Sequence, residues 1–168
     1  TELGSTVLRR MDLRQEALPQ MRALVETWDE TCDLSIFDSD QVFYVEVLRG
    51  SHALTIAAAV GQRLPAYCTA SGRLFLAHLA GEALDRYLER PLKAHTPKTI
   101  TSPEGIRQEL ARIGQQGFAM DSEEFELGVC AIAAPIYNRH GQMIAAIGGP
   151  SPISRISRRA AVPCACCP

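Results

Sequence analysis

Apolar residues in the segment 12–28 recur every three or four positions, which is the spacing of one face of a helix. We therefore predict an amphipathic helix there, with Asp12 as its N-cap. Pro19 lies inside this pattern. Because proline lacks a backbone N–H and its ring crowds the preceding turn, we expect a kink or a second helix start at this residue.

Two later segments show the same helical period. Residues 73–92 predict two short helices that separate near Gly81. A further helix is predicted between Ser102 and Gly117, and its ends are well marked. Ser102 can cap its start, proline follows at the first helical position, and glycine stands just beyond its end.

Strands are predicted where apolar residues alternate with polar ones or form short runs. The segments 32–37 and 42–50 alternate around a polar turn, which predicts a β-hairpin. Its residues Phe43, Val45 and Val47 are expected to face the core. Further strands are predicted within 52–60, before a loop at Gly61, and over 118–120, 129–137 and 142–149.

This order of elements predicts an α+β fold, because strands come first, helices are inserted, and strands return. We expect a central, largely antiparallel sheet flanked by helices. The 168 residues are 46 % hydrophobic and 21 % charged, which is enough to bury a core as one domain. The last eleven residues, 158–168, show no periodicity and are predicted to form an irregular Cys/Pro-rich tail.

Charge and composition limit the classes of function. The net charge is −2 and the basic residues are scattered, so this chain alone is not expected to bind DNA well. No uncharged apolar run reaches the length of a membrane span, and the first twenty residues lack the pattern of an export signal. We therefore expect no membrane contact and a cytoplasmic location. The start at Thr1 suggests a longer parent protein or a processed start.

The stretch "LPAYCTASGR", residues 64–73, allows three interpretations. Cys68 could be a nucleophile, because a thiolate near a helix N-terminus is stabilised. No histidine is placed beside it as a base, however. Alternatively, the backbone N–H groups of Ala70, Ser71 and Gly72 could bind a carboxylate at the helix start. Spacing alone favours a third interpretation, a plain N-cap by Thr69 or Ser71.

Four acidic residues gather in the stretch 121–126, but their spacing does not define a metal-ligand set. We expect most of them to lie in a solvated loop. Asp121 is the exception, since it follows a predicted strand and can point back toward the sheet. The clustered cysteines of the tail have no second pair at zinc-site spacing. Neither a metal nor a cofactor is predicted.

Three segments, 64–79, 117–147 and 151–157, resemble in this order the C-terminal effector-binding domain of the IclR family of bacterial transcription regulators. The resemblance covers roughly residues 3–157. It implies a GAF/profilin-like fold over 12–157, preceded by the end of an interdomain linker at 1–11. It also implies a non-enzymatic sensor of a small-molecule effector, acting as a homodimer or tetramer, with DNA bound only through a separate N-terminal winged helix-turn-helix domain.

The resemblance also implies a pocket. Family members that bind small carboxylates use backbone N–H groups before a helix and an aspartate, and the matching positions here are Ala70, Ser71 and Asp121. A cysteine and a serine of the last two strands are replaced by Ala131 and Gly148. The remaining candidates complete the predicted site: Cys68 and Gly72 near the helix start, and Leu54, Ile56, Leu64 and Ile132 as its apolar wall.

Three departures from the family pattern change what the resemblance implies for the ligand and the surface. Cys130 is displaced by one residue from the family cysteine, so we expect it to face away from the pocket. Gly148 and Gly149 are expected to enlarge the site and remove a hydroxyl. We therefore expect an effector other than glyoxylate or pyruvate, such as an aromatic acid. The unusual tail replaces a closing helix, so part of the sheet or a dimer surface is expected to be exposed.

Two other classes of function stay open at this point. One is a GAF-like sensor module of a different signalling protein. The other is a cysteine-dependent enzyme that uses Cys68.

Overall fold

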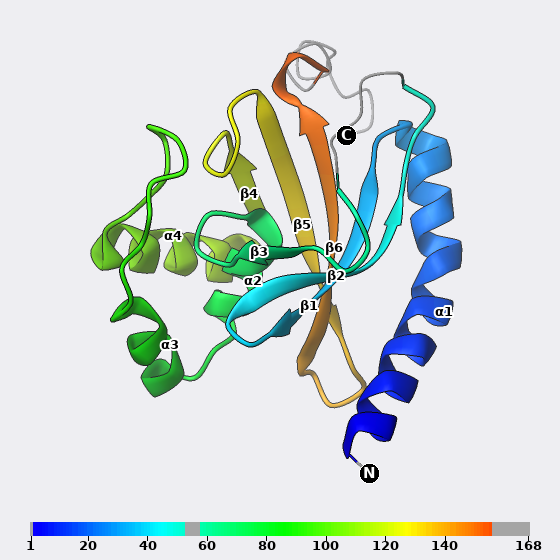
Figure 1. Ribbon diagram of the computed structural model, residues 1–168, viewed down its shortest axis with the longest axis horizontal. Helices are drawn as coiled ribbons and strands as arrows, with labels where there is room; N and C mark the ends of the chain where they lie inside the picture. The colour runs from blue at the N-terminus through cyan, green and yellow to red at the C-terminus, as the bar shows by residue number, and fades with distance from the viewer. Residues whose placement is uncertain (1, 53–57, 156–168) are drawn as a thin grey trace.

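The structure, a computed structural model, describes the backbone of residues 2–52 and 58–155 and the side chains of 11–52 and 58–155. Its centre is a six-stranded antiparallel sheet with the order β3-β2-β1-β6-β5-β4 (Figure 1). The strands are β1 Cys32–Asp38, β2 Gln41–Leu48, β3 Arg63–Pro65, β4 Ala119–Ser122, β5 Val129–Tyr137 and β6 Met143–Pro152. The helices are α1 Glu2–Trp28, α2 Ala70–Ala77, α3 Gly81–Leu88 and α4 Pro103–Gln116.

Helices cover both faces of the sheet. Helix α1 packs along β1 and β2 on one side, while α2 packs on the other side against strands β4, β5 and β6 and against α4 (Figure 1). Each side has its own apolar core, and the larger core lies between the sheet and α2 to α4. The predicted α+β class is confirmed. Among the described residues, no helix is both long enough and apolar enough to cross a membrane.

Helix α1 begins earlier than its apolar pattern predicts. It runs without interruption from Glu2 to Trp28, so Asp12 lies inside it and the predicted N-cap is wrong. Pro19 also lies inside and does not end the helix. On the sheet-facing side, Ala17 and Met21 are buried in the smaller core, and this packing holds the helix on either side of the proline.

The predicted hairpin is present, but its side chains divide between the two cores. Ser39 and Asp40 form its two-residue turn with φ values of 53° and 63°, typical of a type I′ turn. A bulge leaves Val45 without a partner between the pairs of Leu34 and Ser35. Because the extra residue reverses the alternation, Val45 packs toward α1 whereas Val47 packs toward α2. All three predicted residues therefore contact a core, but the expectation that they share one core face is wrong.

The other predicted elements mostly match the structure. Two short helices separate at residues 78–80, and the Oγ of Ser102 accepts a hydrogen bond from the Gly105 N–H at 3.1 Å to cap α4. Gly117 ends that helix with φ 80°. The strand predicted within 52–60 falls mainly on residues 53–57, outside the described residues. The tail at 158–168 also lies outside them.

A buried ion pair ties α2 to the loop between β4 and β5. The Arg73 side chain is 1 % exposed, and its guanidinium donates to both carboxylate oxygens of Glu124, with Nη1 to Oε1 at 2.7 Å. Its Nε also donates to the backbone carbonyl of Tyr67 at 2.9 Å. The single arginine therefore joins the segment before α2, α2 itself and the β4–β5 loop.

We predict that Arg73→Met lowers the free energy of unfolding by about 3–5 kcal/mol, because it leaves the Glu124 carboxylate buried without its partner. Chemical denaturation of the purified chain measures this change. The matched control is Arg107→Met, which removes an exposed ion pair with Asp85 and should cost at most about 1 kcal/mol. Equal losses in the two variants would contradict the structural role of Arg73.

Candidate effector-binding site

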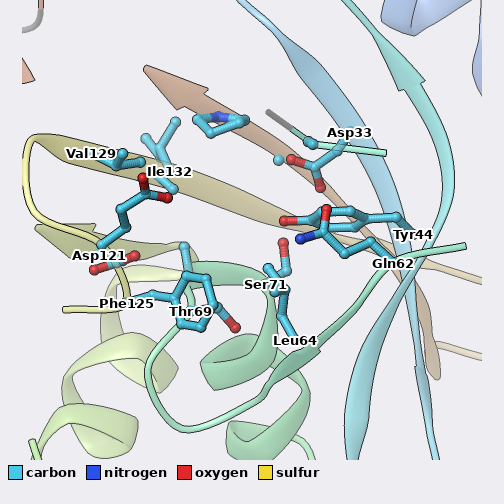
Figure 2. Close-up of a pocket in the computed structure, with 16 residues that line it drawn as sticks. Asp33, Tyr44, Gln62, Leu64, Thr69, Ser71, Asp121, Phe125, Val129 and Ile132 are labelled. Carbon is cyan, nitrogen blue, oxygen red and sulfur yellow. The ribbon is translucent and has the colours of Figure 1, made fainter. Parts of the chain in front are cut away.

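A cavity of about 70 Å³ lies between the sheet and the start of α2. Strands β1, β2, β5 and β6 form one wall, and the start of α2 and the β4–β5 loop form the opposite one (Figure 2). Its lining residues are Asp33, Tyr44, Ala58, Gln62, Leu64, Thr69, Ala70, Ser71, Asp121, Phe125, Glu126, Val129, Ala131, Ile132, Gly148 and Pro150.

The first turn of α2 lines this cavity and has no side-chain capping hydrogen bond. Thr69 is the N-cap by position, but its side chain makes no capping hydrogen bond to the helix. Its Oγ1 donates instead to the Pro65 carbonyl at 2.9 Å. Ala70 and Ser71 thus lie in the first turn of a helix without a side-chain cap, at the positive end of the helix dipole, which favours a carboxylate or another anion.

Asp121, in β4, also lines the cavity and is 5 % exposed. Its Oδ1 accepts a hydrogen bond from the Glu124 N–H at 2.9 Å, which fixes the carboxyl group. Burial raises the pKa of Asp121 to about 6, and the nearby Glu124 carboxylate adds to the rise. The group can therefore accept a hydrogen bond when charged and donate one when protonated.

The rest of the acidic stretch has separate roles, so the prediction of a mainly solvated loop is only partly right. Glu124 is buried in the ion pair with Arg73. Glu123 pairs with Lys98 and accepts from the Gly128 N–H at 2.9 Å, and these contacts lower its pKa. Glu126 is exposed and lines the cavity.

The structure brings most of the predicted site residues together. The cavity is lined by Leu64, Ala70, Ser71, Asp121, Ala131, Ile132 and Gly148. Gly72 does not line it. A Cβ at Gly72 would lie 2.3 Å from the backbone Cα and O atoms of Ala66, so this glycine lets α2 approach the preceding loop. Leu54 and Ile56 lie outside the described residues.

Neither cysteine near the site has the features of a nucleophile. Cys68 is fully buried and does not line the cavity, and burial raises its pKa to about 12, so it stays a thiol at neutral pH. Cys130 also lies outside the lining, and its Sγ contacts the Ser122 Oγ at 3.6 Å. Its neighbours Val129 and Ala131 line the cavity, and so does Ile132. No metal-binding group of three or more ligating side chains occurs among the described residues.

Several lining residues were not predicted from the sequence, and Asp33 is the most informative. It is 3 % exposed, and burial raises its pKa to about 7. The phenol of Tyr44 also lines the cavity, and its pKa is raised by burial and by the charges of Asp33 and Asp121. The sequence signal that could have identified Asp33 is its position inside a predicted strand, because charged residues are seldom buried.

Asp33 also overturns the expectation that Gly148 enlarges the site. The two residues are paired across β1 and β6, and a Cβ at Gly148 would lie 2.7 Å from both carboxylate oxygens of Asp33. The space above the glycine is therefore filled by the carboxylate. Gly149 does not line this cavity, so it cannot enlarge it either.

A second, larger hollow of about 470 Å³ lies on the α1 side of the sheet. Leu24 and Trp28 of α1 and residues of β5 and β6, including Ile147, give it a mainly apolar lining. It offers few polar groups to orient a small ligand. The first cavity, with the start of α2 and Asp121, is therefore the candidate effector site.

Comparison with known proteins places this geometry in a family. The family model described as "Bacterial transcriptional regulator IclR C-terminal" matches residues 5–164. The chain belongs to the IclR family. As an IclR-family chain it represents the effector-binding part of such regulators, and this membership decides against a GAF-like module from a different class of signalling protein.

Three relatives show the extent of the IclR likeness. The transcriptional repressor IclR of Escherichia coli is 32 % identical over 158 residues, covering 92 % of this chain and 58 % of the repressor. The crystal structure of the Thermotoga maritima IclR has a TM-score of 0.82 at 30 % identity, covering 95 % and 67 % of the two chains. An IclR homologue from Microbacterium hydrocarbonoxydans, complexed with 4-hydroxybenzoate, has a TM-score of 0.82 at 31 % identity, covering 90 % and 66 %.

The IclR relatives are longer than this chain, which spans about three fifths of the length of the curated regulators that it matches. Family membership confirms the predicted fold class and the interpretation as an effector-binding domain.

We predict that the stability of the domain depends on the protonation of Asp33. Folding raises the Asp33 pKa to about 7, so the unfolded chain releases this proton at lower pH than the folded chain does. The contribution of Asp33 to the free energy of unfolding should therefore fall as the pH rises from about 4 to about 7. Over this range the stability of Asp33→Asn relative to wild type should rise by a few kcal/mol. Urea denaturation at several pH values measures this, with the exposed Asp12→Asn as the control.

We also predict that Gly148→Ala destabilises the domain by about 1–3 kcal/mol, because its Cβ would overlap the carboxylate of Asp33. The matched control is Gly149→Ala, whose Cβ would meet its nearest neighbour, the Thr31 carbonyl oxygen, at 3.7 Å. Thermal denaturation compares the two variants. Adding Asp33→Ala should restore much of the stability lost in Gly148→Ala. A loss that the second substitution leaves unchanged would contradict the steric conflict.

Proposed function

We propose that the cavity between the sheet and the start of α2 binds a small organic acid and that this binding controls a DNA-binding regulator. One observation carries the proposal: the start of α2, which has no side-chain cap, and the buried residue Asp121 line the same cavity. The helix start suits the ligand's carboxylate, and Asp121 suits a hydroxyl or another donor.

The cavity supports a compact ligand. Its volume is about 70 Å³, and the carboxylate of Asp33 occupies the space that the absence of a side chain at Gly148 leaves. The candidate effectors are therefore small hydroxy acids, keto acids and aromatic acids. The Microbacterium hydrocarbonoxydans homologue, which is complexed with 4-hydroxybenzoate, supports the aromatic class.

The regulatory action follows from differential binding. An effector changes DNA affinity only if it binds one arrangement of the regulator more tightly than another. We propose that DNA is contacted by a winged helix-turn-helix domain of the parent protein, that 1–11 belong to the linker before 12–157, and that the regulator acts as a homodimer or tetramer in the cytoplasm. The chain performs no catalysis in this proposal, and the buried thiol of Cys68 supports that part.

We predict that filling the cavity abolishes effector binding. Thermal denaturation of the chain with keto, hydroxy and aromatic acids should reveal at least one class that stabilises it, by about 2.7 kcal/mol when the acid is present at 100 times Kd. Ala131→Leu should remove this shift, because the larger side chain enters the cavity.

The matched control is Ala134→Leu, on the same strand but exposed and outside this cavity. It should keep the shift. Stabilisation that survives Ala131→Leu unchanged would mean that the acid binds elsewhere.

A further inference from the structure

Asp33 is a buried carboxylate on the wall of the cavity whose Oδ1 atom has no hydrogen-bond partner among the described residues. Figure 2 shows Asp33 and Tyr44 on one side of the cavity and Asp121 and Phe125 on the other, with Ser71 between them. Buried polar atoms without partners are destabilising and rare in native proteins. An unpaired oxygen beside an enclosed cavity therefore calls for a partner that enters the cavity.

The backbone is shaped to admit this carboxylate. Asp33 and Gly148 are paired between β1 and β6, and any side chain at 148 would collide with the carboxylate oxygens. The Asp33 carboxylate thus occupies the space that a side chain at position 148 would need. The glycine at 148 therefore leaves room for the carboxylate beside the cavity.

The charge of the lining also limits what can bind. Three carboxyl groups, those of Asp33, Asp121 and Glu126, line the cavity, and none of the lining residues is lysine, arginine or histidine. A ligand with only negative charge would meet these groups without a compensating cation. Among the described lining residues, those at the start of α2 have the electrostatic character to hold a carboxylate.

We propose that Asp33 is a specificity-determining residue of the cavity and selects effectors that present a hydroxyl or an ammonium group to it while their carboxylate lies at the start of α2. This inference rests on the proposed function, because it assigns a second polar contact to the same effector site. A hydroxyl would donate a hydrogen bond to the unpaired Oδ1, and an ammonium group would form an ion pair as well. The high pKa of Asp33 suits this role, since a donor in the cavity would stabilise the charged carboxylate.

The test uses two sets of acids matched in size. Propionate, lactate and alanine form the small set, with no donor, a hydroxyl and an ammonium group, respectively. Benzoate, 3-hydroxybenzoate and 3-(aminomethyl)benzoate form the aromatic set. In calorimetric titration of the chain, a donor-bearing acid should bind at least about tenfold more tightly than the donor-free acid of its set. The two kinds of donor are ranked in the same experiment.

In Asp33→Ala this advantage should fall to about twofold or less, whereas the exposed Asp12→Ala should leave it unchanged. Asp33→Asn keeps the size of the side chain and serves if the alanine variant does not fold. It should reduce the advantage of the ammonium acid to that of the hydroxy acid, because the neutral amide oxygen accepts a hydrogen bond but cannot form an ion pair.

The outcomes separate this inference from the proposed function. In one outcome, the acids bind and Ala131→Leu abolishes binding, but the donor-bearing acids bind no more tightly than the donor-free ones. In another, the donor-bearing acids keep their advantage in both Asp33 variants. The effector site would then stand, and the selective role of Asp33 would be overturned. If none of the six acids binds the folded chain, or if Ala131→Leu leaves binding unchanged, the proposed function itself fails and the inference falls with it.

Discussion

The buried ion pair between Arg73 and Glu124 is the constraint on which the arrangement of the site depends. It joins the first turns of α2 to the β4–β5 loop, and the same loop supplies the N–H that fixes Asp121. A buried ion pair gains little net stability because both charges lose water, but removing one partner is costly. Its effect here is positional, since it holds the helix start and the Asp121 carboxyl beside the same cavity.

The cavity unites two opposite electrostatic preferences. The start of α2 favours an anion, whereas Asp33, Asp121 and Glu126 favour a cation or a hydrogen-bond donor. Burial resolves part of the conflict, because it raises the pKa values of Asp33 and Asp121 toward neutrality and so reduces the negative charge of the empty site. A ligand with both an acid and a donor group would satisfy both preferences, which gives the sensor a physical basis for selectivity.

Family membership and site chemistry answer different questions about this chain. The match to the IclR C-terminal domain fixes the fold and the general task of effector binding. It leaves the effector open, because the residues that line a cavity vary while the scaffold stays the same. The Asp33–Gly148 pair shows how such variation works, since a carboxylate on β1 takes the space that a side chain on β6 would need.

Local periodicity and short motifs in the sequence were enough to predict most of the helices and strands, the capped ends of α4 and the position of Asp121 at the end of a strand. The interpretation of the α2 start as an anion site came from the family resemblance, because spacing alone favoured a plain N-cap. The roles of Asp33, Arg73 and Gly148, by contrast, depend on contacts that appear only in the folded chain. Helices cover both faces of this sheet, so alternation alone could not say which face of a strand borders a core and which a cavity. That choice depends on the register between strands and on the bulge in the hairpin, which are set by contacts between residues far apart in the chain.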